Sequence, residues 1–201
     1  MNRASEETDD ALVRAIVSGN TELFTCLLNR YQSFIFAVVA KHVPSSQVED
    51  VAQEASIQLY RSLNTYTSKG NFKSWLSTIT VRSCYTFLRH HYRRKEVMHI
   101  DLSEHHYQWL NRLMALESSE KFNQHLRAKE AKELLDTVLF SLNADDQMVV
   151  RLIHFEGYTA AETAKMLGWS TANVKIRAFR SRKKLHKRLK KLLLNEQGVA
   201  V

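Results

Sequence analysis

Polar side chains that can read DNA bases recur at short spacing near the C-terminus, at Asn173, Lys175 and Arg177. Lysine and arginine donate hydrogen bonds to guanine edges, and asparagine pairs with the edge of adenine. The cations that follow are suited to phosphates, which position a protein on DNA without specifying a sequence. The complete set predicted to contact DNA here is Ser170, Thr171, Asn173, Lys175, Arg177, Arg180, Arg182, Lys183 and Lys184.

The residues just before this set predict the element that presents it. Thr159 and Glu162 have the spacing of a capping box, so a helix begins near residue 160. Gly168 can adopt the left-handed conformation that ends this helix, and Ser170 or Thr171 then caps a second one. Two helices joined by a tight turn, the second of them basic, predict a helix-turn-helix whose second helix enters the major groove. The alternative is an ordinary helical hairpin with a solvated basic face.

The charge of the 201-residue chain is divided into blocks. The chain carries 29 Lys+Arg and 21 Asp+Glu, for a formal charge of +8. Residues 61–100 and 171–201 are strongly basic, whereas residues 1–60 and 101–170 are each net acidic. Two basic blocks predict two contacts with a polyanion, and nucleic acid is the natural candidate.

A membrane is a weaker candidate partner. No apolar run is expected to reach the roughly 18 residues of a spanning helix, and the polar, acidic start predicts no signal peptide. Cys26 and Cys84 lie in apolar helical patterns and are expected to be core residues in a reducing compartment. We therefore expect a cytoplasmic protein without direct membrane insertion.

The fold is predicted to be all-α. One proline and five glycines leave few strand-ending turns, and no two-residue alternation of polarity is present. Helices are expected over residues 9–18 and 21–42, from Pro44 onward, and from about residue 72 to 91. Residues 96–127 have mixed polarity and a weak helical period, and they predict a flexible linker between two small helical domains, 9–95 and 128–190.

Catalytic and metal chemistry are disfavoured. The sequence has no glycine-rich phosphate loop and no paired-cysteine motif. The histidines in and near the linker, His90, His91, His99, His105 and His106, lack the i, i+4 spacing that presents two metal ligands from one helix face. We expect no catalytic residue, no metal and no cofactor.

Motifs in both halves are typical of one family. The first half carries Val48-Glu49-Asp50-Val51-Ala52-Gln53-Glu54, close to an Asp-x-x-Gln-Glu signature, and Phe72-Lys73-Ser74-Trp75-Leu76-Ser77-Thr78-Ile79. The second half carries Glu162-Thr163-Ala164, Leu167-Gly168 and Val174-Lys175, with Arg180 and Arg182. On these motifs the chain resembles the extracytoplasmic-function (ECF, group IV) sigma factors of bacterial RNA polymerase, which belong to the sigma-70 family. The resemblance covers about residues 9–95 and 128–190.

The resemblance implies a role for each part. Residues 9–95 would be sigma region 2 and residues 128–190 sigma region 4, which would read the −35 promoter element with the helix-turn-helix. The acidic run would bind core RNA polymerase through Glu49, Asp50, Gln53 and Glu54. A basic and aromatic surface would bind and melt the −10 element of promoter DNA. It would comprise Tyr66, Lys69, Asn71, Phe72, Lys73, Arg82, Tyr85, Thr86, Arg89, Arg93 and Arg94. An anti-sigma factor, often membrane-bound in this family, would hold the protein inactive.

Physical chemistry agrees with these roles to different degrees. Exposed carboxylates beside a DNA-binding surface repel phosphate, so the acidic run suits a protein partner; the alternative is a solvated helix face. Melting requires aromatic platforms, a pocket and a cationic track for the unstacked strand. Phe72 and Trp75 lie on an apolar stripe, which favours the core over a stacking role.

The chain departs from the family pattern at several positions. Arg82 stands where asparagine is usual, and Thr86 stands where aspartate or asparagine is common, so no −10 consensus is transferred. Ile176 replaces a small or polar residue, and Thr163 replaces isoleucine; both are interpreted as changes of specificity or packing. Two alternative functions remain: a sigma-like mimic that sequesters an anti-sigma factor, and a stand-alone helix-turn-helix regulator.

Overall fold

The computed structural model describes residues 7–68, 70–97 and 139–196, and every regular element within these ranges is helical, as the composition predicts. Residues 98–138 lie outside the described residues. Most of the predicted linker and the predicted start of the second domain at residue 128 fall there.

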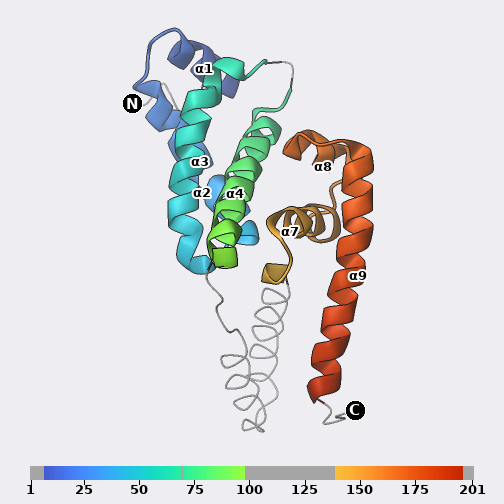
Figure 1. Ribbon diagram of the computed structural model, residues 1–201. Helices are drawn as coiled ribbons and strands as arrows, with labels where there is room; N and C mark the ends of the chain where they lie inside the picture. Colours follow the sequence, from blue (N-terminus) through green and yellow to red (C-terminus); the bar gives the residue numbers. More distant parts are fainter. Residues whose placement is uncertain (1–6, 69, 98–138, 197–201) are drawn as a thin grey trace, which may run out of the picture.

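The N-terminal half is a bundle of α1 (Asp9–Val17), α2 (Leu23–His42), α3 (Val48–Ser62) and α4 (Phe72–Val97). Figure 1 shows α2, α3 and α4 running alongside one another, with α1 across one end. Thr8 caps α1, and its Oγ1 accepts a hydrogen bond from the Ala11 N–H at 3.3 Å. The core of this half is made of leucine, isoleucine, valine and alanine side chains at helical spacing, including Leu12, Leu27, Ile35, Ala55, Leu59, Leu76 and Leu88.

Helix α2 corrects one expectation. Over Leu23–His42 it is long and apolar enough to cross a membrane by length and composition, so the expectation that no segment reaches this length is wrong. The same test is passed by core helices of soluble proteins. Here Leu27, Ile35 and Val39 are buried in the bundle, and α2 packs against both α3 and α4. Its apolar composition is thus used at least in part to form the core.

The C-terminal half contains α7 (Ala144–Val150), a π turn (Arg151–Phe155), α8 (Ala160–Leu167) and α9 (Thr171–Glu196). The predicted capping box is present: Thr159 Oγ1 accepts from the Glu162 N–H, and the Glu162 carboxylate accepts from the Thr159 N–H. Gly168 ends α8 with φ of 72°, in the left-handed region that glycine tolerates best. Ser170 is the residue that caps α9, because its Oγ accepts from the Asn173 N–H at 3.2 Å.

The two halves pack against each other through α4, which lies next to α7 and α8 (Figure 1). One hydrophobic core runs through both halves and includes Leu88 of α4 with Met148 and Leu152 of the C-terminal half. At its edge, the buried His42 places Nε2 2.9 Å from Glu156 Oε1. The Arg151 guanidinium donates to the carbonyl of Lys41. We refer to this packing of α7 and α8 on α4 as the closed arrangement.

The two cysteines are both free thiols. Cys84 lies on the buried side of α4 with no exposed surface, whereas Cys26 is half-buried on α2. Both therefore serve the packing of helices, which agrees with the apolar pattern around them.

Candidate nucleic-acid interface

Helix α9 presents one buried face and a broad exposed face. Val174 and Ser181 have no exposed surface and pack toward α7 and α8. The exposed residues among the predicted −35 set are Ser170, Thr171, Asn173, Lys175, Arg180, Arg182, Lys183 and Lys184. These residues therefore lie on the solvent-exposed part of the helix-turn-helix, and their contact with DNA stays a prediction.

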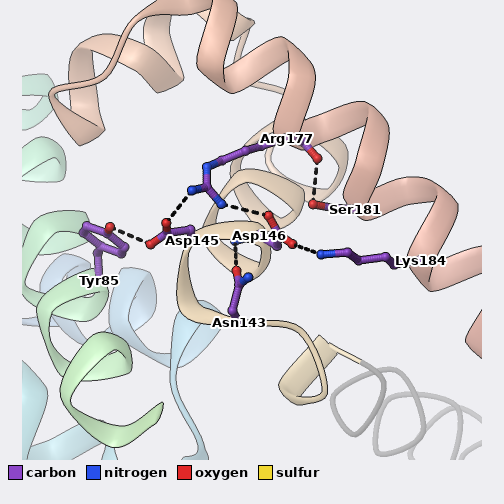
Figure 2. Close-up of polar contacts among 7 residues, drawn as sticks. All are labelled: Tyr85, Asn143, Asp145, Asp146, Arg177, Ser181 and Lys184. Carbon is purple, nitrogen blue, oxygen red and sulfur yellow. Dashed lines mark hydrogen bonds and ion pairs between the residues drawn. The ribbon is translucent and has the colours of Figure 1, made fainter. Parts of the chain in front are cut away.

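Arg177 is the one half-buried member of the predicted −35 set. Figure 2 shows its guanidinium turned toward the start of α7, where Nη2 lies 2.8 Å from Asp145 Oδ2 and Nη1 lies 3.1 Å from Asp146 Oδ1. Its guanidinium also stacks over the ring of Trp169 at 5.3 Å. In this arrangement Arg177 holds α9 to α7 and is not free to reach a base.

The aspartates that bind Arg177 were not singled out from the sequence. Asp146 is buried, with 4% of its side chain exposed, and it also accepts from Lys184 Nζ at 2.6 Å. Asn143 caps α7, and its Oδ1 accepts from the Asp146 N–H at 2.8 Å. The Asn-x-Asp-Asp spacing indicates the start of a helix, because asparagine is a favoured N-cap and acidic residues in the first turn complement the helix dipole.

The predicted −10 surface splits into a buried part and an exposed part. Phe72 is 3% exposed and packs with Tyr66 and Trp75, at ring separations of 5.2 and 5.4 Å. The Tyr66 hydroxyl lies 2.8 Å from Asp10 Oδ1 and 3.0 Å from the Gly70 carbonyl. Burial and the hydrogen bond to Asp10 raise the pKa of Tyr66 to about 12. These aromatic side chains anchor the start of α4, and Phe72 offers no ring face to a base here.

Other members of the −10 set also begin α4. Asn71 Oδ1 accepts from the Lys73 N–H at 2.8 Å, as a helix cap does, and Lys73 Nζ lies 4.9 Å from the centre of the Phe34 ring. Lys69 and the side chains of Arg93 and Arg94 lie outside the described residues. Their predicted role stays a prediction.

Further along α4, the predicted −10 residues face the C-terminal half. Arg82 donates from Nε to the Met166 carbonyl at 2.7 Å and from Nη2 to the Lys165 carbonyl at 3.3 Å. The Tyr85 hydroxyl donates to Asp145 Oδ1 at 2.7 Å (Figure 2). Burial, together with this aspartate, raises the pKa of Tyr85 to about 12. Two predicted DNA-contacting residues are therefore engaged by α7 and by the end of α8 in the closed arrangement.

The acidic run lies on the solvent side of α3. Glu49, Asp50, Gln53 and Glu54 are all exposed, so the side chains predicted to bind a protein partner share one surface. The exposed side chains of Ile57 and Tyr60 continue along the same helix, at 39% and 44% exposure. Apolar side chains on an otherwise polar face are typical of protein interfaces.

A groove of about 550 Å³ separates this acidic surface from α4. Asp50 and Glu54 form its acidic wall, and Arg82, Thr86 and His90 contribute to the opposite wall. The residues predicted for polymerase binding and part of those predicted for −10 recognition thus lie on two sides of one groove. Arg89 sits nearby on α4, with its guanidinium 5.6 Å from the centre of the Tyr85 ring.

The described residues contain no group of three or more His, Cys, Asp and Glu that could hold a metal ion. Of the histidines considered above, His90 and His91 belong to α4, whereas His99, His105 and His106 lie outside the described residues.

Comparisons with known proteins match both halves of the chain. The Sigma-70 region 2 family matches residues 27–94, and the Sigma-70 region 4 family matches residues 132–185. The ECF RNA polymerase sigma-E factor of Escherichia coli (strain K12) is 27% identical over 187 residues, covering 92% of this chain and 96% of that protein. Its counterpart in Haemophilus influenzae is 25% identical over 193 residues, covering 94% of this chain and all of that protein.

Two solved structures share the fold. CnrH, solved in complex with the cytosolic domain of CnrY, is 21% identical and has a TM-score of 0.53, covering 92% of this chain and 99% of that chain. The sigma factor RpoE of Bartonella quintana, solved with the anti-sigma factor NepR, is 19% identical with a TM-score of 0.51, covering 83% and 96%. With both sigma regions matched in order and the relatives matched over nearly their full length, this chain belongs to the sigma-70 family, as a member of its ECF group.

Proposed function

We propose that this chain is an ECF-type sigma factor that binds core RNA polymerase and directs it to promoters by recognising −35 and −10 elements and melting the DNA. The observation that carries the proposal is the presence of both sigma regions in order on one chain. The chain acts as a DNA-binding regulator in the cytoplasm, where polymerase and promoters are found, and not as an enzyme.

The proposed polymerase contact is the acidic surface of α3. Asp50, Gln53 and Glu54 are exposed next to Ile57, which gives the surface both charge and apolar area. A negative surface repels the phosphates of DNA and attracts a basic protein surface, so the contact suits polymerase better than promoter.

The proposed −35 contact is the exposed face of α9. Lys175, Arg180 and Lys183 extend from it into solvent and supply positive charge for the DNA backbone and base edges. Arg177 and Lys184 serve α9 in a second way, because their aspartate contacts fix the helix on α7.

The proposed −10 contact requires the closed arrangement to open. While the halves are closed, Arg82 Nε donates to the end of α8 and the Tyr85 hydroxyl donates to α7, so these donors are not available to a promoter strand. We infer that the free chain is closed and that engagement with polymerase separates the halves. The RpoE structure with NepR supports a further partner, an anti-sigma factor that holds the chain inactive.

Co-elution with bacterial core RNA polymerase on size exclusion tests the polymerase contact. The wild-type chain is expected to co-elute, and Asp50→Ala/Gln53→Ala/Glu54→Ala is expected to elute alone. A matched control, Glu7→Ala/Glu22→Ala/Gln32→Ala, also changes two acids and one amide, all exposed elsewhere, and it should co-elute. A wild-type chain that fails to co-elute would favour the mimic or the stand-alone regulator.

Transcription from a selected promoter tests whether α9 reads the −35 element, which is required of a sigma factor and not of a sigma-like mimic. Lys175→Ala/Arg180→Ala/Lys183→Ala changes only exposed residues of α9. It should abolish −35-dependent transcription while polymerase binding persists. Transcription unchanged by this variant would show that α9 is not the −35 reader.

A further inference from the structure

The outermost ridge of α9 is apolar. Phe179 is 65% exposed and Ile176 is 50% exposed, although most of the large apolar side chains described in this half are buried. The two residues are three positions apart, and the exposed Ala172 precedes Ile176 by four, so the three lie on one face of the helix. Val174 and Ser181, both without exposed surface, occupy the opposite face. The apolar ridge Ala172–Ile176–Phe179 is therefore not part of the core.

Polar and cationic side chains flank this ridge on both sides. At 3.6 residues per turn, Lys175 and Arg182 lie along one flank, and Asn173 and Arg180 lie along the other. All of these flanking residues are exposed. A partner that complements the surface needs an apolar strip between two anionic walls.

The major groove of duplex DNA supplies both features where its sequence contains thymine. The 5-methyl group of thymine is the apolar feature that base pairs present there, and phosphates line both edges of the groove. The apolar ridge begins in the first turn of α9, and recognition helices contact bases with their N-terminal residues. An acidic protein would satisfy the charges, but nothing in this arrangement favours it over the groove that a recognition helix enters.

The contacts of Arg177 also favour a role for apolar side chains in reading DNA. Its guanidinium lies against Asp145 and Asp146, which removes one of the three residues predicted to read base edges. In the same turns of α9, the exposed positions include the apolar Ile176 and Phe179 beside Lys175 and Arg180. Sequence discrimination must then rest more on apolar contact than the number of cations suggests.

Resting on the proposed function, we propose that Ile176 and Phe179 determine −35 specificity by contacting thymine 5-methyl groups. The −35 elements of this sigma factor then contain thymine where the second and third turns of α9 meet the groove. Burying one methyl group at the interface should raise the affinity for DNA by about fourfold.

Deoxyuridine substitution tests this directly, because it removes the 5-methyl group and keeps every hydrogen-bonding atom of thymine. Duplexes are first selected with the full-length chain bound to core polymerase. Each thymine of the −35 element is then replaced singly by deoxyuridine, and affinity is measured by fluorescence anisotropy. For the wild type we expect a loss of about fourfold at one or two positions.

The protein variants assign the contact. Ile176→Ser and Phe179→Ala should each lose the sensitivity to deoxyuridine at the thymine that the changed side chain contacts, and each should respond like the wild type at every other thymine. Phe155→Ala is the matched control, because Phe155 is 52% exposed but lies outside α9; it should keep the wild-type profile. Because the DNA change leaves the protein intact, the test does not depend on the folding of any variant.

Three results would overturn the inference. Sequence-specific binding that tolerates deoxyuridine at every position refutes the methyl contact and leaves the proposed function standing. If Ile176→Ser and Phe179→Ala lose as much affinity on deoxyuridine substitution as the wild type does, the methyl contact does not belong to these residues. No promoter binding, with core polymerase present, refutes the proposed function as well.

Discussion

Removal of the Tyr85 hydroxyl should open the closed arrangement. Tyr85→Phe deletes the hydrogen bond to Asp145 Oδ1, formed at 2.7 Å between α4 and α7. The ring remains, so its edge contact with Trp169, at 5.6 Å between centroids, is kept. The variant therefore isolates one polar contact between the two halves.

The size of the effect follows from the surroundings of the acceptor. A hydrogen bond to a charged group contributes about 1.5–3 kcal/mol. Asp145 has 31% of its side chain exposed and keeps Arg177 Nη2 at 2.8 Å, so its carboxylate stays solvated and paired after the substitution. The lower end, about 1.5 kcal/mol, is then appropriate, and it corresponds to about a tenfold fall in the ratio of closed to open chains.

Single-molecule energy transfer measures this ratio. Dyes are attached to cysteines introduced at the exposed positions Ser18 and His186 in a Cys26→Ser background. At a urea concentration where the unsubstituted chain is half closed, the closed fraction of Tyr85→Phe should fall to about one tenth.

Tyr60→Phe is the control, because it removes the same group from a 44% exposed side chain of α3. It should leave the closed fraction unchanged. Equal closed fractions in Tyr85→Phe and the unsubstituted chain would refute the idea that this contact holds the halves together. An equal fall in both variants would trace the effect to the loss of any tyrosine hydroxyl.

Three further predictions concern stability. Asp146→Ala should lower the free energy of unfolding by about 2–3 kcal/mol in chemical denaturation, because the buried carboxylate accepts from Arg177 and Lys184; Asp146→Asn should cost less. Gly168→Ala should cost about 1 kcal/mol, a backbone cost alone, since φ is 72° and nothing lies within 4 Å of the added carbon. The pKa values of Tyr31, Tyr66 and Tyr85 are raised from 10.0 to about 12 by burial and an aspartate partner. Their contribution to stability is complete below pH 10.0 and is lost as pH rises toward about 12. A phenolate absorbance titration should show at least these tyrosines ionising late, and a single transition near 10 for every tyrosine of the folded chain would contradict this.

The sequence predicts local structure well where one side chain acts on its own backbone. The capping box of Thr159 and Glu162 and the left-handed Gly168 were both expected and are both confirmed. Helix α4 was expected to end near residue 91 but extends to Val97, because its basic last turns carry no glycine or proline to stop them. The π turn at Arg151–Phe155 has no signal in the pattern.

The site was less predictable, because it depends on contacts between segments far apart in the chain. Its side-chain type and its place near the start of α9 put Arg177 among the predicted base-reading residues, but its side chain meets Asp145 and Asp146 of α7. Arg82 was recognised as unusual, yet its bonds to the carbonyls of α8 could not be read from spacing. Exposure of Ile176 and Phe179 needed the structure as well, since apolar residues on a helix are normally assigned to its core.

The burial of Cys84 gives the molecule a built-in chemical reporter. Burial raises the pKa of this thiol to about 12, so almost none of it is thiolate at neutral pH, and peroxides or alkylating reagents need both thiolate and access. While α4 stays packed, the group is inert. Its alkylation therefore proceeds only through transient exposure of α4, and the alkylation rate reports how often that happens. Comparing the rate at Cys84 in a Cys26→Ser background, for the free chain and for the chain on polymerase, would show whether holoenzyme formation loosens α4 or tightens it.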